Sequence, residues 1–287
     1  MKTIILSDIN NSAKSIIPYG LRLARELESE VDILHVIDPR SHQGTYSSVS
    51  DSQSISPGDT LSHEETIQQE LTRAKRNLDK VLSAEGSRLN YPLKINRIVV
   101  KNSLEDELDK QFAKNPDCLF LVNAEVDQNM LDTTDEVVRL IKKAGVPSLV
   151  VPPGEKFKAD INALMPLNLD QNNFSSLTNL KFLFHGLKIT IDAVGVVGNQ
   201  NYATMELKSI AWKDAVSGFY LPNTTLDINI LEGKDINHTI SNYFNRNHQD
   251  MLLAINDSPN NQLSVSDTVE LINSIESPAL VYFPKSK

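Results

Sequence analysis

The chain has 287 residues, of which 40% are hydrophobic and 23% charged. At roughly 100–200 residues per domain this length predicts two domains, and the composition is that of an ordinary globular protein. The net charge of −9 is shared along the chain, with 18 basic and 23 acidic residues up to Pro152 and 10 and 14 after it. A nucleic-acid-binding protein needs a basic face, so the sequence argues against a nucleic-acid partner.

Cys118 is the single cysteine, which excludes an intrachain disulfide and a multi-cysteine zinc site. It lies in an apolar segment, where a small buried hydrophobic role is favoured over a nucleophilic one. The six histidines lack metal-binding companions such as HExxH, so no metal site is expected. We find neither a signal-peptide apolar region of about 7–15 residues nor the run of about 20 apolar residues that spans a membrane. We therefore expect a cytoplasmic protein with no membrane partner.

In the first half, short apolar segments alternate with helical patterns. Strands are expected at 4–6, 31–36, 95–100, 118–122 and 148–151. Between them, three- and four-residue spacing of apolar side chains predicts helices. A capping box of Ser62 with Glu65, and caps of Ser103 with Asp106 and Thr133 with Glu136, predict where three of them begin. The serine-rich stretch 39–62 has no periodicity and predicts a long loop. A plain insertion is favoured over a lid or docking segment.

The second half repeats this plan. Strands are expected at 161–167, 189–197, 226–230, 251–255 and 279–283, with helices between them at 174–187, 203–219 and 236–244 and a last one capped by Ser264 with Asp267. Alternation of strand and helix calls for a doubly wound parallel sheet. We therefore expect an α/β chain of two tandem doubly wound five-stranded parallel-sheet domains, at 1–152 and 153–287.

Matches in order between the halves indicate a duplication. The segment 117–123 lies over 250–256, and Asp117 and Asn123 then coincide with Asp250 and Asn256. Further along, 133–136 lies over 264–267, and 147–152 lies over 278–284. Three such matches in the same order make the duplication the preferred explanation.

The first half resembles the universal stress protein family. The resemblance lies in Ile4-Ile5-Leu6-Ser7-Asp8, in Asn11-Ser12 before a helix with Leu23-Ala24, in Val31 to Asp38, in the strand after Asp117, and in Pro147 to Pro152. It implies a five-stranded parallel α/β unit in each half. Members often dimerise through their last strands, and tandem members can pair their own domains in this way. Here that would bring 148–151 beside 279–283, with a homodimer as a further possibility.

The resemblance also implies where a ligand would bind. Asp8, Val36 and Asn123 occupy family ligand-binding positions, although for Asp8 a capping role at the end of the strand is favoured over ligand binding. ATP-binding members carry a glycine-rich loop after the fourth strand, because glycines let backbone N–H groups approach the phosphates. The windows 123–136 and 256–267 contain neither glycine nor Lys or Arg, and both contain aspartates. ATP held in the usual manner is therefore not expected, whereas adenosine or another small ligand near Asp8 and Asn123 stays open.

These observations lead to three hypotheses. The first is a non-enzymatic stress-response or regulatory protein of the universal stress type, without a cofactor and with a degenerate nucleotide site. The alternative is an atypical ATP- or adenine-nucleotide-binding protein with weak ATPase activity. The third is a scaffold that binds an unknown protein partner.

Overall fold

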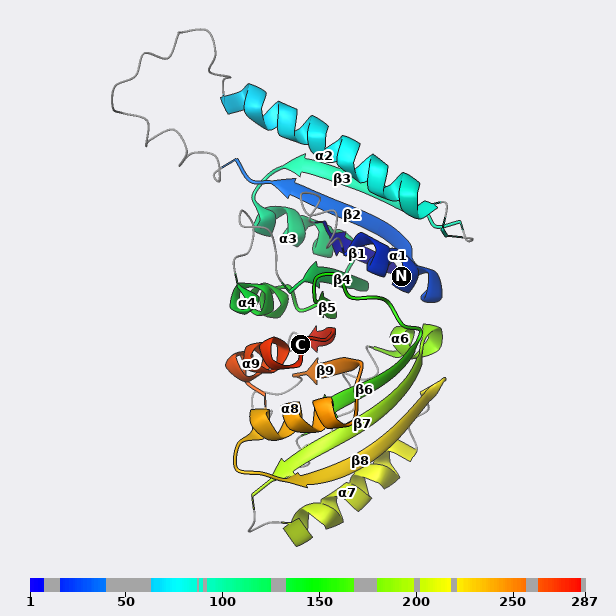
Figure 1. Ribbon diagram of the computed structural model, residues 1–287, viewed down its shortest axis with the longest axis vertical. Coiled ribbons are helices and arrows are strands. Elements are labelled where there is room, and N and C mark those ends of the chain that lie inside the picture. Colours follow the sequence, from blue (N-terminus) through cyan, green and yellow to red (C-terminus); the bar gives the residue numbers. More distant parts are fainter. Residues whose placement is uncertain are drawn as a thin grey trace, which may run out of the picture.

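The ten strands of the described residues form one continuous sheet in the computed structural model (Figure 1). The structure describes residues 1–7, 16–39, 63–86, 88–89, 92–124, 133–167, 180–198, 202–217, 221–256 and 263–284. Strand order is β3-β2-β1-β4-β5-β10-β9-β6-β7-β8. The second five strands mirror the first five, so the sheet consists of two similar parallel halves joined at β5 and β10.

The first unit alternates strictly between strand and helix, as the sequence predicts. Its elements are β1 (Lys2–Leu6), α1 (Ile17–Glu26), β2 (Glu30–Ile37), α2 (His63–Gly86), β3 (Ile95–Lys101), α3 (Leu104–Lys114), β4 (Cys118–Asn123), α4 (Thr134–Ala144) and β5 (Ser148–Val151). The predicted caps of α3 and α4 are confirmed: Ser103 accepts from the Asp106 backbone, and Thr133 forms a complete capping box with Glu136. The predicted cap at Ser62 and nearly all of the serine-rich stretch 39–62 lie outside the described residues.

The second unit repeats the alternation. Its elements are β6 (Asp160–Pro166), α6 (Lys181–Gly186), β7 (Lys188–Val197), α7 (Tyr202–Ser217), β8 (Thr224–Glu232), α8 (Ile236–Arg246), β9 (Met251–Ile255), α9 (Val265–Ile275) and β10 (Ala279–Tyr282). The capping box of Ser264 and Asp267 is confirmed. Of the helix expected at 174–187, the described residues contain only α6, because 168–179 lie outside them.

Two apolar cores lie on the two faces of the sheet, and each core runs through both units. One packs α1, α2, α6 and α7 against the sheet through residues such as Leu21, Leu78 and Phe184. The other packs α3, α4, α8 and α9 through residues such as Leu108, Ile141 and Phe244. No helix in the described part of the chain is long and apolar enough to cross a membrane.

The units meet where β5 pairs antiparallel with β10. Leu149 lies opposite Leu280, and Val150 lies opposite Ala279. Figure 1 shows α4 and α9 side by side over this junction, where the Thr134 hydroxyl donates to Asn273 Oδ1 at 2.7 Å. On the other face, the end of α6 reaches the end of α1. The sheet and both apolar cores are therefore continuous across the junction.

Backbone hydrogen bonds correct the duplication register by one residue. Phe120 N donates to Pro147 O, and Leu252 N donates in the same way to Pro278 O. Phe120 therefore corresponds to Leu252, which makes Ile255, and not Asn256, the counterpart of Asn123. The match of Asp117 and Asn123 to Asp250 and Asn256 is thus wrong, because identical letters one residue out of register lie on opposite faces of a strand.

Gly186 at the end of α6 provides a test of the junction. A Cβ at this position would lie 2.6 Å from Glu26 O and 3.1 Å from Leu27 Cα, which are both backbone atoms of the first unit. Gly186→Ala should therefore lower the free energy of unfolding by about 1–3 kcal/mol, the usual cost of overpacking. Urea denaturation measures this change.

Gly86→Ala is the matched control, because a Cβ at Gly86 meets nothing within 4 Å. That variant should be neutral or more stable by about 0.4–1 kcal/mol, since alanine narrows the unfolded ensemble. Equal stabilities for the two variants would contradict the close contact between α6 and α1.

Candidate functional site

The first unit has a topological switch point between β1 and β4. The chain leaves β1 toward β2 and β3, then returns to β4 on the other side of β1. In open α/β sheets, ligands bind outside the carboxyl ends of the strands at such a point, because the following loops part there. Ser7 follows β1 and Asn123 ends β4, so both residues lie at this position.

Ser7, His35 and Asn123 form one buried polar cluster, which we call the switch-point site. The register that pairs Ile5 with Leu121 brings Ser7 beside Asn123 when it is continued by two residues. Strand alternation places all three side chains on the face that α1 and α2 cover. Ser7 N donates to Leu34 O at 2.8 Å, and His35 Nδ1 lies 3.1 Å from Ser7 O.

Two side-chain atoms of the switch-point site have no hydrogen-bond partner. Ser7 is 1% exposed and Asn123 2% exposed. Within the described part of the chain, Ser7 Oγ and Asn123 Oδ1 are buried without any partner. A buried polar atom left unsatisfied costs about 1–3 kcal/mol, so a pair of them on adjacent strands needs an explanation. A ligand that supplies a donor at this place would satisfy them.

The second unit has lost this cluster. Leu167 N donates to Val194 O as Ser7 N donates to Leu34 O, so Leu167 corresponds to Ser7. Ile255 corresponds to Asn123 by the register given above, and Gly195 corresponds to His35. Apolar side chains thus replace those of Ser7 and Asn123, and a glycine without a side chain replaces His35. The switch point of the second unit can offer a ligand no comparable hydrogen bond.

The structure separates the residues that the resemblance singled out. Asn123 ends β4 on the α1 face, whereas Val36 is buried in the core of the opposite face, so the two side chains do not converge. Asp8 lies outside the described residues, as do 125–132 and 257–262 within the two glycine-loop windows. The roles of Asp8, Val36 and Asn123 stay predictions. Sequence reasoning missed Ser7, which its position just after a buried strand could have indicated.

Two residues with reactive or aromatic side chains, Cys118 and Trp212, are buried. Cys118 is buried, and that burial raises the pKa of its thiol to about 12, which leaves almost no thiolate at neutral pH. Trp212 is buried in the core beneath α7. Among the described residues, no group of three or more His, Cys, Asp or Glu is placed to hold a metal ion.

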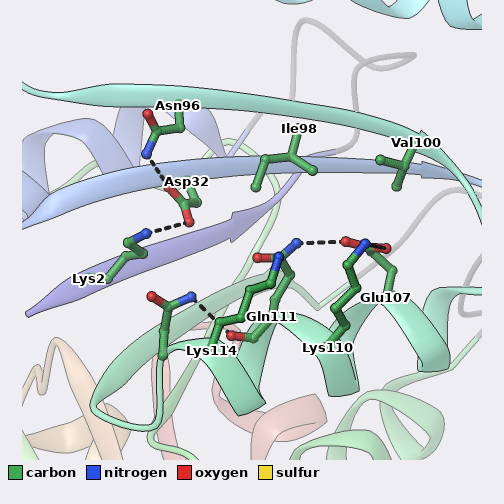
Figure 2. A pocket seen from close by; sticks show the side chains of 10 residues that line it. Lys2, Asp32, Asn96, Ile98, Val100, Glu107, Lys110, Gln111 and Lys114 are labelled. Carbon is green, nitrogen blue, oxygen red and sulfur yellow. Dashed lines mark hydrogen bonds and ion pairs between the residues drawn. The ribbon is translucent and has the colours of Figure 1, made fainter.

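A separate groove runs between α3 and the strands β2 and β3 (Figure 2). It holds about 370 Å³. At one end Asp32, which is buried, receives Lys2 Nζ at 2.9 Å and Asn96 Nδ2 at 2.7 Å. Ile98 and Val100 form its wall along β3. It lies on the face opposite the switch-point site.

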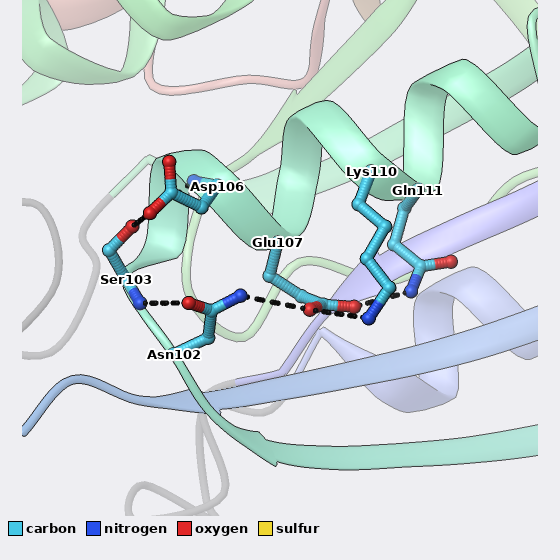
Figure 3. A network of polar contacts seen from close by, with 6 residues as sticks. All are labelled: Asn102, Ser103, Asp106, Glu107, Lys110 and Gln111. Atoms are coloured by element: carbon cyan, nitrogen blue, oxygen red, sulfur yellow. Dashed lines mark hydrogen bonds and ion pairs between the residues drawn. The ribbon is translucent and has the colours of Figure 1, made fainter.

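Glu107 organises the helical wall of this groove (Figure 3). It is 1% exposed, and its carboxylate accepts hydrogen bonds from Gln111 at 2.6 Å, Asn102 at 3.2 Å and Lys110 at 3.3 Å. Burial by itself would raise the pKa of Glu107, but these donors outweigh it and the pKa is lowered. Glu107 is therefore a charged anchor, and it holds the Gln111 amide along the helix.

Comparisons with known proteins agree with this architecture. No protein-family model matches the chain, and neither does any curated protein. A universal stress protein from Archaeoglobus fulgidus DSM 4304 aligns with a TM-score of 0.63 at 12% identity, over 98% of this chain and 97% of that one. A putative universal stress protein from Pseudomonas aeruginosa UCBPP-PA14 aligns at 0.52 and 13%, over 98% and 91%.

The cytoplasmic domain of a prokaryotic cation chloride cotransporter is similar as well, with a TM-score of 0.51 at 8% identity, over 99% of this chain and 95% of that one. The chain therefore has the fold of universal stress proteins over nearly its whole length. Identities this low establish the fold, while the residues of the site must carry the function.

Glu107→Gln tests the anchor. A glutamine at this position would direct its NH2 group toward a donor such as Lys110 or Gln111. The variant should therefore lose about 1–3 kcal/mol of unfolding free energy at pH 7. Folding lowers the pKa of Glu107, so the ionised carboxylate stabilises the folded protein. This stabilisation is fully present above the unfolded-state pKa of 4.5 and is lost as the pH falls through the folded-state pKa. The difference between wild type and variant should therefore shrink below about pH 4.5, as urea denaturation at several pH values would reveal.

Glu105→Gln on the same helix is the control, because Glu105 is exposed and pairs only with Lys143 at 2.8 Å among the described residues. An exposed pair is worth about 0–1 kcal/mol, so this change should be small. A difference for Glu107→Gln that stays constant from pH 7 to pH 3 would contradict the charged anchor.

Proposed function

We propose that the chain is a non-enzymatic regulatory protein of the universal stress type, acting in a stress response. Its first unit binds one small ligand at the switch-point site, and its second unit serves as a built-in structural partner. The observation that carries the proposal is the pair of unpartnered buried atoms at the switch point of the first unit, Ser7 Oγ and Asn123 Oδ1. The equivalent positions of the second unit are Leu167 and Ile255, which have no polar side-chain atoms. A ligand with a hydrogen-bond donor would satisfy both atoms.

The ligand is a polar molecule without a phosphate chain, with a nucleoside such as adenosine as the model. The windows 123–136 and 256–267 contain no glycine to bring backbone N–H groups near phosphates, and no Lys or Arg to offset their charge. They contain carboxylates instead, which repel an anion. ATP in the usual family manner, and its hydrolysis, therefore fit the chain less well than a neutral ligand.

The pairing of the two units takes the place of the family's dimer contact. In this chain β5 and β10 occupy each other's edges, so the surface through which members often dimerise is used internally. A homodimer or a protein partner would have to bind elsewhere. Native mass spectrometry of the purified protein, which reports subunit number and any retained ligand together, addresses both points.

Adenosine binding is the direct test of the switch-point site. A ligand that binds only the folded state at 100 times its Kd stabilises it by about 2.7 kcal/mol, so adenosine should raise the thermal midpoint. Mg-ATP should bind no more tightly than adenosine, and no phosphate should be released. Asn123→Ile, which places an aliphatic residue there as in the second unit, should abolish the shift. Thermal denaturation and isothermal titration measure these effects.

Asn123→Ile also separates binding from folding. Removing an unsatisfied buried polar atom is neutral or stabilising, so the unliganded variant should be at least as stable as the wild type. Asn245→Ala, at an exposed position of α8, serves as the control and should keep the adenosine shift. Tight Mg-ATP binding with hydrolysis would support the atypical ATPase instead. If neither compound binds, adenine ligands are excluded and the scaffold hypothesis is favoured. A protein partner recovered in stoichiometric amount by pull-down would then support that hypothesis.

A further inference from the structure

The groove beside α3 has a counterpart in the second unit, and the comparison indicates what the groove can hold. Helices α3 and α8 match residue for residue. Ser103 and Asp235 cap them at corresponding positions, and Asn115 N donates to Gln111 O as Asn247 N donates to Tyr243 O. Tyr243 therefore stands where Gln111 stands in the first unit.

The carboxylates at the ends of the two grooves also correspond. Since Leu34 and Val194 accept equivalent hydrogen bonds from Ser7 N and Leu167 N, Asp32 and Asp192 occupy the same place on β2 and β7. Each lies next to the third strand of its unit, opposite Asn96 and Asp227 respectively. The two units thus keep one carboxylate at the same point beneath equivalent helices.

In the second unit a tyrosine side chain reaches this carboxylate. The Tyr243 hydroxyl donates to Asp192 Oδ2 at 3.3 Å and accepts from Asn229 Nδ2 at 3.3 Å, while Gln249 Nε2 donates to Asp192 Oδ2 at 2.7 Å. The Tyr243 ring packs against the core. Burial and the nearby Asp192 charge both raise the pKa of the phenol, which keeps it protonated as a donor.

In the first unit no described side chain of α3 bonds to the corresponding carboxylate. Gln111 is shorter than tyrosine, and its amide is held by Glu107 at 2.6 Å, so it does not reach Asp32 (Figure 2). Asp32 accepts one bond from Lys2 and one from Asn96, and a carboxylate has about four acceptor positions. The groove of about 370 Å³ falls in the usual range of small-molecule sites, about 300–1,000 Å³.

The charges along the helical wall of the groove favour an anion. Three lysines, Lys2, Lys110 and Lys114, line it against two carboxylates, Asp32 and Glu107. Lys2 and Lys110 are paired to these carboxylates, whereas Lys114 has no ion pair among the described residues. On a chain whose net charge is −9, this is a local site of positive charge.

We propose that the groove binds a small hydroxyaromatic acid, whose hydroxyl donates to Asp32 as Tyr243 donates to Asp192 and whose carboxylate meets Lys110 and Lys114. The ring lies against Ile98 and Val100, which β3 directs toward α3 in Figure 2. The site is independent of the switch-point site, because the two lie on opposite faces of the sheet. The first unit therefore takes up from solution the group that the second unit supplies from its own chain.

The test uses 4-hydroxyphenylacetate as the probe, measured by isothermal titration and ligand-observed NMR on the full chain. One molecule should bind per chain. Phenylacetate, which lacks the hydroxyl, and p-cresol, which lacks the carboxylate, should each bind about tenfold more weakly, the loss expected for one charge-assisted hydrogen bond.

Two variants locate the probe in the groove. Gln111→Tyr places the second unit's own residue in the groove and should abolish binding. Lys114→Ala, at an exposed and unpaired position, should weaken 4-hydroxyphenylacetate about tenfold and leave p-cresol unchanged. Asn123→Ile, at the switch-point site, should leave probe binding intact, so this proposal and the adenosine proposal fail separately. Absence of binding to the folded wild type, or equal binding by Gln111→Tyr, would overturn the proposal.

Discussion

The antiparallel pairing of β5 with β10 is the constraint on which the rest of the structure depends. Both strands have four residues, and every side chain in them is buried. A short strand that is apolar on both faces cannot form a sheet edge without exposing unpaired backbone groups beside hydrophobic side chains. Joining the units at these strands moves the edges to β3 and β8, whose side chains are largely exposed or half-buried. The chain thus uses two fully buried strands as the junction.

The direction of this pairing determines where the functional surfaces lie. The strands of the two units run in opposite directions at the junction. The carboxyl ends of β4 and β9 therefore point in opposite directions along the strands. The two switch points are therefore separate sites. Each could diverge without affecting the other. The first keeps Ser7 and Asn123, whereas the second has exchanged them for Leu167 and Ile255.

The sequence predicted the elements well and their finer alignment less well. Apolar runs with flanking prolines located β5 and β10 almost to the residue, because burial on both faces requires an unbroken hydrophobic segment. The register predicted for the duplication was wrong by one residue. An Asp precedes and an Asn ends or follows both β4 and β9, and residue identities alone do not tell which face of the sheet a side chain occupies. The groove could not be predicted. It depends on Gln111 being held by Glu107, a choice of hydrogen-bond partner that no local pattern encodes.

The two differences between the units run in the same direction. At the switch point, the second unit has Leu167 and Ile255 where the first unit has polar side chains. Beneath the helix after the third strand, Tyr243 fills a position that is a groove in the first unit. Filled positions stabilise, while unsatisfied polar atoms and open grooves cost stability and persist where a function needs them. One continuous sheet joins the two units, so the first unit keeps its polar switch point and open groove beside a neighbour that has filled both positions. In a chain with two copies of one fold, one copy can thus lose a binding surface while the other copy keeps it.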